Sequence, residues 1–345
     1  MILYFSVIFR GMMVTHNPII PNDAILQYYF YFMQERMNIF WRKNQKVGCS
    51  MYWTDDPILQ KFKFTNVYRV TDRVTQYLIR EIILPDSDNL SPKDLLLRVI
   101  VFKIFNKIET WEYLKRVLNE PITTASFNPR EISMLLTKYQ RETPIFNNAY
   151  MMTGSHQKYD YLPTKHEKWL TMVKNEMIDG GALERMLCSN SLEDLYNVLH
   201  ECSFIGPFLA YQYAIDLNYT PYFNYSENSF VKAGIGAIRG IKKCFISYGD
   251  HFEDAIHYIA KNYKKLQQKY GYTAFHSIPG HEPTLIDFQN CFCETDKYLR
   301  AKMPEMKVDN VRIKQLYKCH HTPIKYTFPK KWNIQTNIEY TPQNN

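Results

Sequence analysis

The chain has 345 residues and a formal net charge of +8, with 46% hydrophobic and 22% charged residues, which are ordinary proportions for a globular protein. Its seven cysteines are odd in number and include no C-x-x-C pair, which favours free thiols in a reducing compartment over a disulfide framework. The apolar start is only nine residues long, too short to span a bilayer, so we expect a soluble intracellular protein with no membrane partner. It would act in the host cytoplasm if viral and in the nucleus if eukaryotic.

Apolar residues recur at helical spacing through most of the chain, and strand signals are few. The pattern predicts helices over residues 24–43, 129–140, 165–177, 191–201, 206–217, 250–270 and 286–302, and a helical pair over 95–118 that bends near Asn106. Thr54 or Asp55 is a predicted N-cap, with Pro57 in the first turn. A further helical repeat is predicted from Phe64, Val67, Val70, Val74 and Leu78. The predicted fold class is therefore mainly α.

The length allows one large domain or two smaller ones. The predicted organisation has three parts. They are an extension over residues 1–23, a helical domain over 24–302 in which residues 121–165 can separate two lobes, and a basic tail over 303–345. Ten Lys or Arg residues lie between Lys297 and Lys331, against only Glu305 and Asp309. Basic residues next to aromatic ones suit a nucleic-acid partner, whereas a solvated tail is the simpler alternative.

Several enzyme classes lack their signatures here. The sequence has no G-x-x-x-x-G-K-[ST] motif for a P-loop kinase, no zinc-deaminase pattern, no H-E-x-x-H and no G-x-S-x-G. Cys291 and Cys293 would point about 200 degrees apart on a helix, which argues against joint zinc ligation. We therefore predict no metal site and no cofactor.

Two glycine turns each open a predicted helix. Gly206 precedes Pro207, and Gly234 and Gly236 precede Arg239. A helix start presents free N–H groups, and a missing Cβ lets a phosphate approach closely. These four candidates, Gly206, Gly234, Gly236 and Arg239, predict a helix-hairpin-helix grip on DNA, whereas two ordinary loops are the simpler alternative.

Three polar groups are candidates for the chemistry. The first comprises Trp53, Asp55, Asn66, Tyr68, Arg69, Asp72 and Arg73; Asn66, Arg69 and Asp72 are predicted to share one helix face, with Arg73 beside them. The second comprises Gln212 and Asp216 after the Gly206 turn, and Glu227 about twenty residues beyond it. The third comprises Asp287, Asn290, Glu294, Asp296 and Lys297, of which the first three recur at helical spacing on one side. An ion-pair ladder, a helix-end residue and a solvated helix face are the respective structural alternatives.

Short motifs across roughly residues 25–300 resemble one DNA-modification superfamily. They are Phe40-Trp-Arg-Lys43, Trp53-Thr-Asp-Asp-Pro-Ile-Leu59, Phe64-Thr-Asn-Val-Tyr-Arg69 with Asp72-Arg73, Ile205-Gly-Pro-Phe-Leu-Ala210, Ala233-Gly-Ile-Gly-Ala-Ile-Arg-Gly240 and Cys293-Glu-Thr-Asp-Lys-Tyr298. The superfamily contains the α-glutamyl/putrescinyl thymine pyrophosphorylases and the helical domain of 5-hydroxymethyluracil DNA kinases. The resemblance implies a helical fold related to helix-hairpin-helix DNA glycosylases. It also implies activity on DNA that contains modified thymine, as in bacteriophages.

The resemblance implies that an amino acid or polyamine displaces a phosphate or pyrophosphate from activated 5-hydroxymethyluracil in DNA. By residue type, the leaving-group cations would be Arg42, Arg69 and Lys297, and the carboxylate that deprotonates the amine would be Asp55, Asp216 or Glu294. Trp53 and Tyr68 would stack on a flipped base, and Asn66 and Asn290 complete the predicted substrate-binding residues.

Two alternatives stay open. A DNA glycosylase would use Asp216 or Glu227, although no lysine follows the hairpin as the glycosylase pattern requires. A non-catalytic DNA-binding protein would keep only the fold. In each enzyme interpretation, the stretches 53–73 and 287–297 should meet beside the hairpin.

Overall fold

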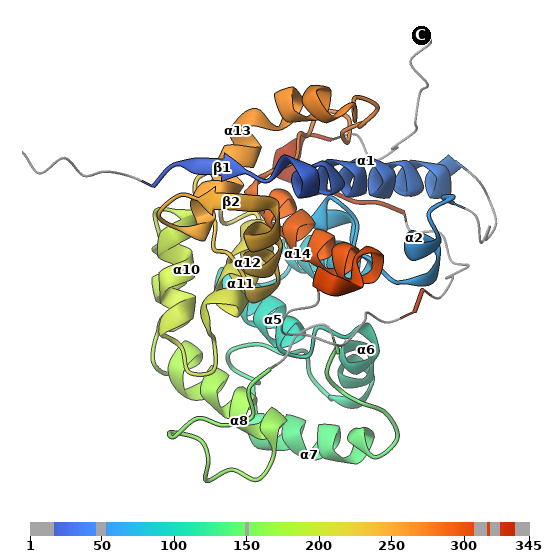
Figure 1. The fold of residues 1–345 in the computed structure, drawn as a ribbon. Helices are drawn as coiled ribbons and strands as arrows, with labels where there is room; N and C mark the ends of the chain where they lie inside the picture. Colours follow the sequence, from blue (N-terminus) through green and yellow to red (C-terminus); the bar gives the residue numbers. More distant parts are fainter. Residues whose placement is uncertain (1–16, 46–52, 149–151, 307–315, 318–324, 335–345) are drawn as a thin grey trace, which may run out of the picture.

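The computed structural model describes residues 17–45, 53–148, 152–306, 316–317 and 325–334, which are mainly helical (Figure 1). The helices are α1 (Asp23–Gln45), α2 (Pro57–Lys61), α3 (Arg73–Leu78), α4 (Leu84–Asp86), α5 (Pro92–Phe105), α6 (Ile108–Val117), α7 (Pro129–Gln140), α8 (Lys165–Met172), α9 (Ala182–Leu187), α10 (Leu192–Glu201), α11 (Pro207–Asn218), α12 (Ile235–Cys244), α13 (Phe252–Tyr270) and α14 (Leu285–Lys302). Strands β1 (Ile19–Pro21) and β2 (Phe245–Tyr248) pair antiparallel. The predicted mainly α fold class is confirmed.

Local capping explains where several helices begin and end. Ser91, Asn128, Thr164 and Ser191 each accept a hydrogen bond at the N-cap of α5, α7, α8 and α10, respectively. The predicted bend is found at Asn106, which closes α5 in the left-handed conformation with φ of 48°. Asparagine tolerates that conformation better than most residues, so the chain can turn there into α6.

The predicted helical repeat from Phe64 to Leu78 is wrong. Residues 63–66 have no regular structure, Arg69–Thr71 form a 3₁₀ turn, and α3 begins only at Arg73. Tertiary contacts decide this, because the backbone N–H of Arg69 donates to Asp287 on α14 instead of to a helical carbonyl. The cap of α2 is also corrected. Asp56, rather than Thr54 or Asp55, accepts from the first N–H groups of that helix.

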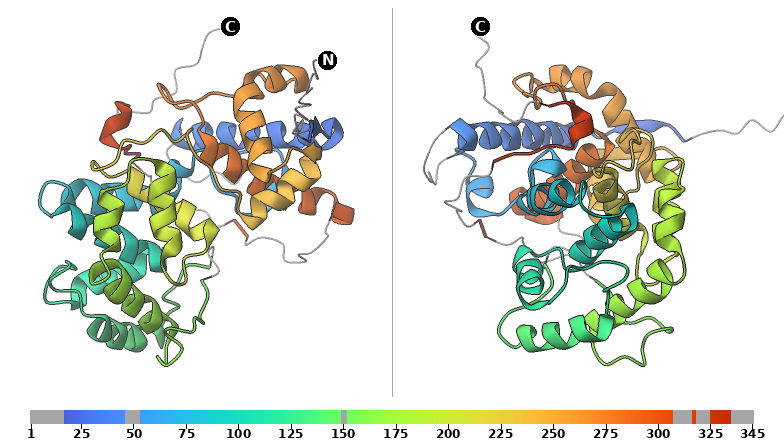
Figure 2. Two further views of the ribbon diagram at one scale, coloured as in Figure 1. Left: turned by 90° about the vertical axis from the view of Figure 1, so that its left-hand side faces the viewer. Right: turned by 180° about the vertical axis from the view of Figure 1, so that it is seen from behind.

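Helix α14 packs against α1, from the first part of the chain, and against α12 and α13, which precede it in the sequence (Figure 2). Its backbone lies very close to α12. A Cβ built at Gly240 would overlap the carbonyl oxygen of Phe292, and one at Gly236 would overlap the sulfur of Cys293. These two glycines are therefore explained by helix packing.

We expect Gly240→Ala to lower the free energy of unfolding by about 1–3 kcal/mol, because the added methyl group meets backbone that must shift. Gly206→Ala is the matched control. A Cβ at Gly206 meets nothing within 4 Å and φ is −71°, so only the poorer N-cap preference of alanine acts and a loss of about 0.5 kcal/mol is expected. Urea unfolding of both variants measures the difference, and equal losses would contradict the close packing of α12 on α14.

One hydrophobic core runs through most of the described chain. Residues 121–165 contribute to it through Ile122, Phe127, Ile132, Leu136 and Tyr159. The predicted domain boundaries at residues 23 and 302 and the lobe division stay predictions, and most of the extension and tail lies outside the described residues. None of the helices described is both long and apolar enough to cross a membrane.

Candidate functional site

Asp216 on α11 lies at the centre of a buried ion-pair network. Its carboxylate receives two hydrogen bonds from the guanidinium of Arg69, at 2.7 and 2.8 Å, and lies 3.0 Å from Nζ of Lys103. Gln212, one turn earlier, accepts from Nε of Arg69 at 2.7 Å. Burial alone would raise the pKa of Asp216, but Arg69 and Lys103 together lower that pKa below its ordinary value.

This geometry argues against two predicted roles. Asp216 has none of its surface exposed, and its oxygens are bound by two cations, so it is poorly placed to take a proton from an amine. Arg69 is 5% exposed, and its guanidinium donates to Asp216 and Gln212. These bonds leave the guanidinium poorly placed to bind a phosphate. In this arrangement both residues hold the fold together, and their predicted roles in the chemistry stay predictions. The network ties α11 and α5 to the segment before α3.

The stretches 53–73 and 287–297 do meet, as expected from the sequence. Asn290 donates to the carbonyl oxygen of Asn66 at 2.9 Å, and Glu294 accepts from the N–H of Thr65 at 3.2 Å. Lys297 donates to the same Glu294 carboxylate at 2.6 Å. Because Glu294 is only 1% exposed, the alternative of a solvated helix face is wrong for this part of α14.

Arg36 belongs to this second network, and the sequence did not single it out. Its guanidinium donates to the side chain of Asn66 at 2.7 Å and to the backbone oxygen of Thr65 at 3.0 Å. Burial raises the pKa of nearby Asp72 to about 6, although the N–H of Asn66 and the charges of Arg69 and Arg36 oppose the rise. The network fixes the irregular loop that precedes α3.

Three other predicted residues pack or pair within the protein. Trp53 is buried in a small cluster of apolar side chains, and Tyr68 is buried with its hydroxyl donating to the backbone oxygen of His281. Both rings are packed within the protein in this arrangement, and their predicted stacking role stays a prediction. Arg42 donates to the backbone oxygen of Trp53, and Asp55 is exposed in the turn before α2. Their predicted roles stay predictions.

The two glycine turns differ in what they require. Gly234 and Gly236 open α12, where a Cβ would strike Phe208 or Cys293, so packing explains both of them. Gly206 opens α11, and neither its φ nor a neighbouring protein atom requires glycine. Close approach of a ligand backbone remains a reason for glycine there. DNA contact by Gly206 and Arg239 stays a prediction.

Glu227 is the residue whose surroundings stand out, although the sequence suggested it only through its distance from Gly206. It is 7% exposed, accepts from the indole N–H of Trp332 at 3.2 Å and receives the hydroxyl of Thr284 at 3.4 Å. Burial and the carboxylate of Asp287 raise the pKa of Glu227 to about 7, while Lys331 and Trp332 limit the rise. A buried carboxyl group that titrates near neutrality is suited to proton transfer.

We expect Glu227→Gln to flatten part of the pH dependence of stability. The folded protein holds the proton of Glu227 more tightly than the unfolded chain, whose pKa is near 4.5. This contribution is therefore full below about pH 4.5 and is lost as the pH rises toward 7. Between these pH values the variant should gain more than about 1 kcal/mol of unfolding free energy relative to wild type. Urea unfolding at both pH values measures it, and a constant difference would contradict the raised pKa.

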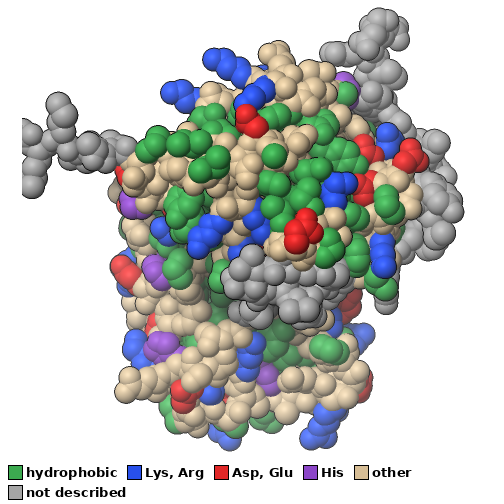
Figure 3. Space-filling view, in the orientation of Figure 1, with side chains coloured by type: hydrophobic (Ala, Val, Ile, Leu, Met, Phe, Trp, Pro, Cys, Tyr) green, Lys and Arg blue, Asp and Glu red, His purple; other side chains and the backbone are tan. Residues whose placement is uncertain are grey.

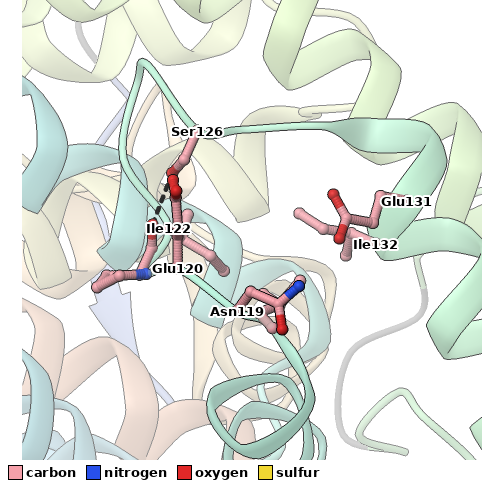
Figure 4. A pocket seen from close by; sticks show the side chains of 8 residues that line it. Asn119, Glu120, Ile122, Ser126, Glu131 and Ile132 are labelled. Atoms are coloured by element: carbon pink, nitrogen blue, oxygen red, sulfur yellow. Dashed lines mark hydrogen bonds between the residues drawn. The ribbon is translucent and has the colours of Figure 1, made fainter.

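Other surfaces of the described chain offer less for a nucleic acid. A pocket between the end of α6 and α7 contains the carboxylates of Glu120 and Glu131 in its lining, and their negative charge does not suit phosphate (Figure 4). On the face drawn in Figure 3, Lys and Arg side chains are scattered among the described residues and do not form one patch. The carboxyl group of Glu227 therefore remains the strongest candidate site.

Comparisons with known proteins agree with this helical architecture. The family model described as "5-hmdU DNA kinase, helical domain" matches residues 23–308. A 5-hmdU DNA kinase of Bacillus phage SP10 is 24% identical over 322 residues, which cover 89% of this chain and 50% of the relative. The chain thus spans about half the length of that relative, and no solved structure matches it. The chain belongs to the family of 5-hmdU DNA kinase helical domains.

Proposed function

We propose that this protein modifies 5-hydroxymethyluracil in DNA by transferring an amine, from an amino acid or a polyamine, onto the activated base. The family match supports 5-hydroxymethyluracil DNA as the substrate class. The observation that carries the proposal is Glu227, a buried carboxyl group with a pKa of about 7 in an aromatic environment.

The proposed reaction is a substitution at the 5-methylene carbon. The amine nitrogen forms a bond to that carbon, the bond from carbon to the phosphate or pyrophosphate oxygen breaks, and the leaving group departs with the electron pair. Glu227 takes the proton that the amine loses. A carboxylate whose pKa lies near the operating pH is efficient in this role, because it is available as a base and still holds the proton afterwards.

The proposal requires the base to leave the DNA stack, since a carboxyl group 7% exposed cannot reach into a duplex. The start of α11 at Gly206 would hold the DNA backbone, and the basic residues of the tail would add salt-dependent affinity. Each of these contacts is independent of the chemistry at Glu227.

Mass spectrometry of nucleosides tests the proposal. The protein is incubated with DNA that carries 5-hydroxymethyluracil, its phosphate or its pyrophosphate, together with glutamate, glycine or putrescine. A new thymine adduct on the activated DNA is expected. DNA that stays unchanged with every amine would overturn the proposal.

The same experiment decides a second candidate function, excision of a modified base. It is favoured by one observation, which is that Glu227 follows the Gly206 hairpin by about twenty residues and could stabilise positive charge at the sugar. Release of free base with an abasic site would establish the glycosylase instead of the transferase.

A further inference from the structure

Trp332, in the segment 325–334, lies beside Glu227 with its indole surrounded by three other rings, and we call the space that the indole occupies the slot. Its indole is parallel to the ring of His281, with centroids 3.7 Å apart and an angle of 16° between the planes. Phe328 lies nearly parallel to it at 5.9 Å, and Tyr219 meets it edge-on at 5.9 Å. The polar atom of the indole donates to the buried carboxyl group of Glu227.

These contacts are the ones that a flipped nucleobase needs. Proteins hold such a base by stacking on an aromatic ring and by hydrogen bonds to its Watson–Crick edge. The N3–H of a uracil ring is a donor, as the indole N–H is, and could replace it on Glu227. An indole has two fused rings, so the space that it occupies is large enough for a pyrimidine with a substituent at carbon 5.

The position of Trp332 is set by specific contacts of residues that precede it in the segment. The buried side chain of Gln76 donates to the carbonyl oxygen of Thr327 at 3.1 Å and accepts from its N–H at 2.7 Å. Lys331 donates to the carbonyl oxygens of Asn218 and Phe223, near the end of α11. The segment is thus bound to the helical body through Thr327 and Lys331, and these contacts place the indole of Trp332 beside Glu227.

From this geometry we infer that Glu227 and His281 form a nucleobase-binding slot for 5-hydroxymethyluracil, and that Trp332 fills this slot until a base displaces it. The inference rests on the proposed substrate class. Beyond that substrate class, the inference names Glu227 and His281 as the residues that bind the base, and Trp332 as the side chain that competes with the base. Competition weakens DNA binding, because the apparent Kd equals the Kd of the open slot divided by the fraction of molecules in which the slot is open.

The test measures binding of a fluorescent single-stranded oligonucleotide with one 5-hydroxymethyluracil by anisotropy, with the full chain. We expect Trp332→Ala to bind at least about tenfold more tightly than wild type, because the competitor is removed. Adding His281→Ala to that variant should remove the gain, because the stacking partner is lost. Tyr161→Ala is the control for a truncated aromatic ring, since Tyr161 is 72% exposed and lies outside both the slot and the basic tail, and it should bind as wild type does.

Weaker binding by Trp332→Ala would overturn the inference, because it would make Trp332 a contact for DNA and not a competitor. Unchanged binding would overturn it as well. If circular dichroism shows that Trp332→Ala does not fold, Trp332→Phe decides, because it keeps a packed ring but cannot donate to Glu227. A gain over wild type then supports the slot, and no gain contradicts it.

A gain for the 5-hydroxymethyluracil oligonucleotide over a thymine oligonucleotide identifies the base as the ligand. This readout needs no reaction. Failure to form an adduct would therefore reject the amine transfer and leave the slot standing, whereas unaltered binding in the variants rejects the slot alone.

Discussion

Replacing Asp216 with alanine is expected to lower the free energy of unfolding by about 3–5 kcal/mol, the range measured when one partner of a buried ion pair is removed. The carboxylate is fully buried between Arg69 and Lys103, which are themselves only 5% and 2% exposed. Without it, two positive charges would face each other away from water, with Gln212 still bound to the Arg69 side chain and Asn106 to Lys103. Most of this loss in unfolding free energy comes from leaving buried cations without their counter-charge, rather than from the packing contacts that the Asp216 side chain makes.

Urea unfolding measures this effect, with Glu201→Ala as the control. Glu201 is paired to Arg185 at 3.4 Å, but both side chains are about half exposed or more, so its loss should cost below about 1 kcal/mol. A loss of less than about 1 kcal/mol in Asp216→Ala would contradict the structural role assigned to the network. It would also reopen Asp216 as a catalytic residue.

The helices were predictable because their signals are local. Apolar spacing and a capping side chain within three residues specify α5, α7 and α10, and each was found close to its predicted range. The loop from Phe64 to Asp72 was not predictable in the same way. Its residues have helical spacing, but Arg69 and Asn66 bond to groups on α14 and to Asp72, and these contacts outweigh the weak local preference.

The candidate site shows the same division. The meeting of residues 53–73 with 287–297 could be expected from their polar residues, which need partners when buried. The environment of Glu227 could not, because its partner Trp332 is 105 residues away and lies in a stretch that looked like a basic tail. Periodicity carries no information about such a contact. The packing of Gly234 and Gly236 could not be predicted for a related reason, since their close neighbours Phe208 and Cys293 belong to other helices.

Replacing Glu227 with glutamine is expected to slow adduct formation by about 10²–10⁴-fold, the usual contribution of a general base. Glutamine has nearly the same shape and can still accept the indole N–H of Trp332, so the segment 325–334 should keep its place. It cannot take a proton from the amine. The rate would be measured by quenched-flow or timed sampling with mass spectrometry of the nucleosides, under conditions where enzyme exceeds DNA.

Glu201→Gln is the control for a carboxylate lost elsewhere, because Glu201 is exposed on the surface and should leave the rate unchanged. Equal rates for Glu227→Gln and wild type would remove Glu227 from the chemistry. The binding assay then separates two explanations. If Trp332→Ala still binds 5-hydroxymethyluracil DNA more tightly, Glu227 positions the base and another group takes the proton, and exposed Asp55 becomes the first residue to replace. If that gain is absent too, the base binds elsewhere, and Trp332 with Glu227 forms a purely structural contact between the tail segment and the helical body.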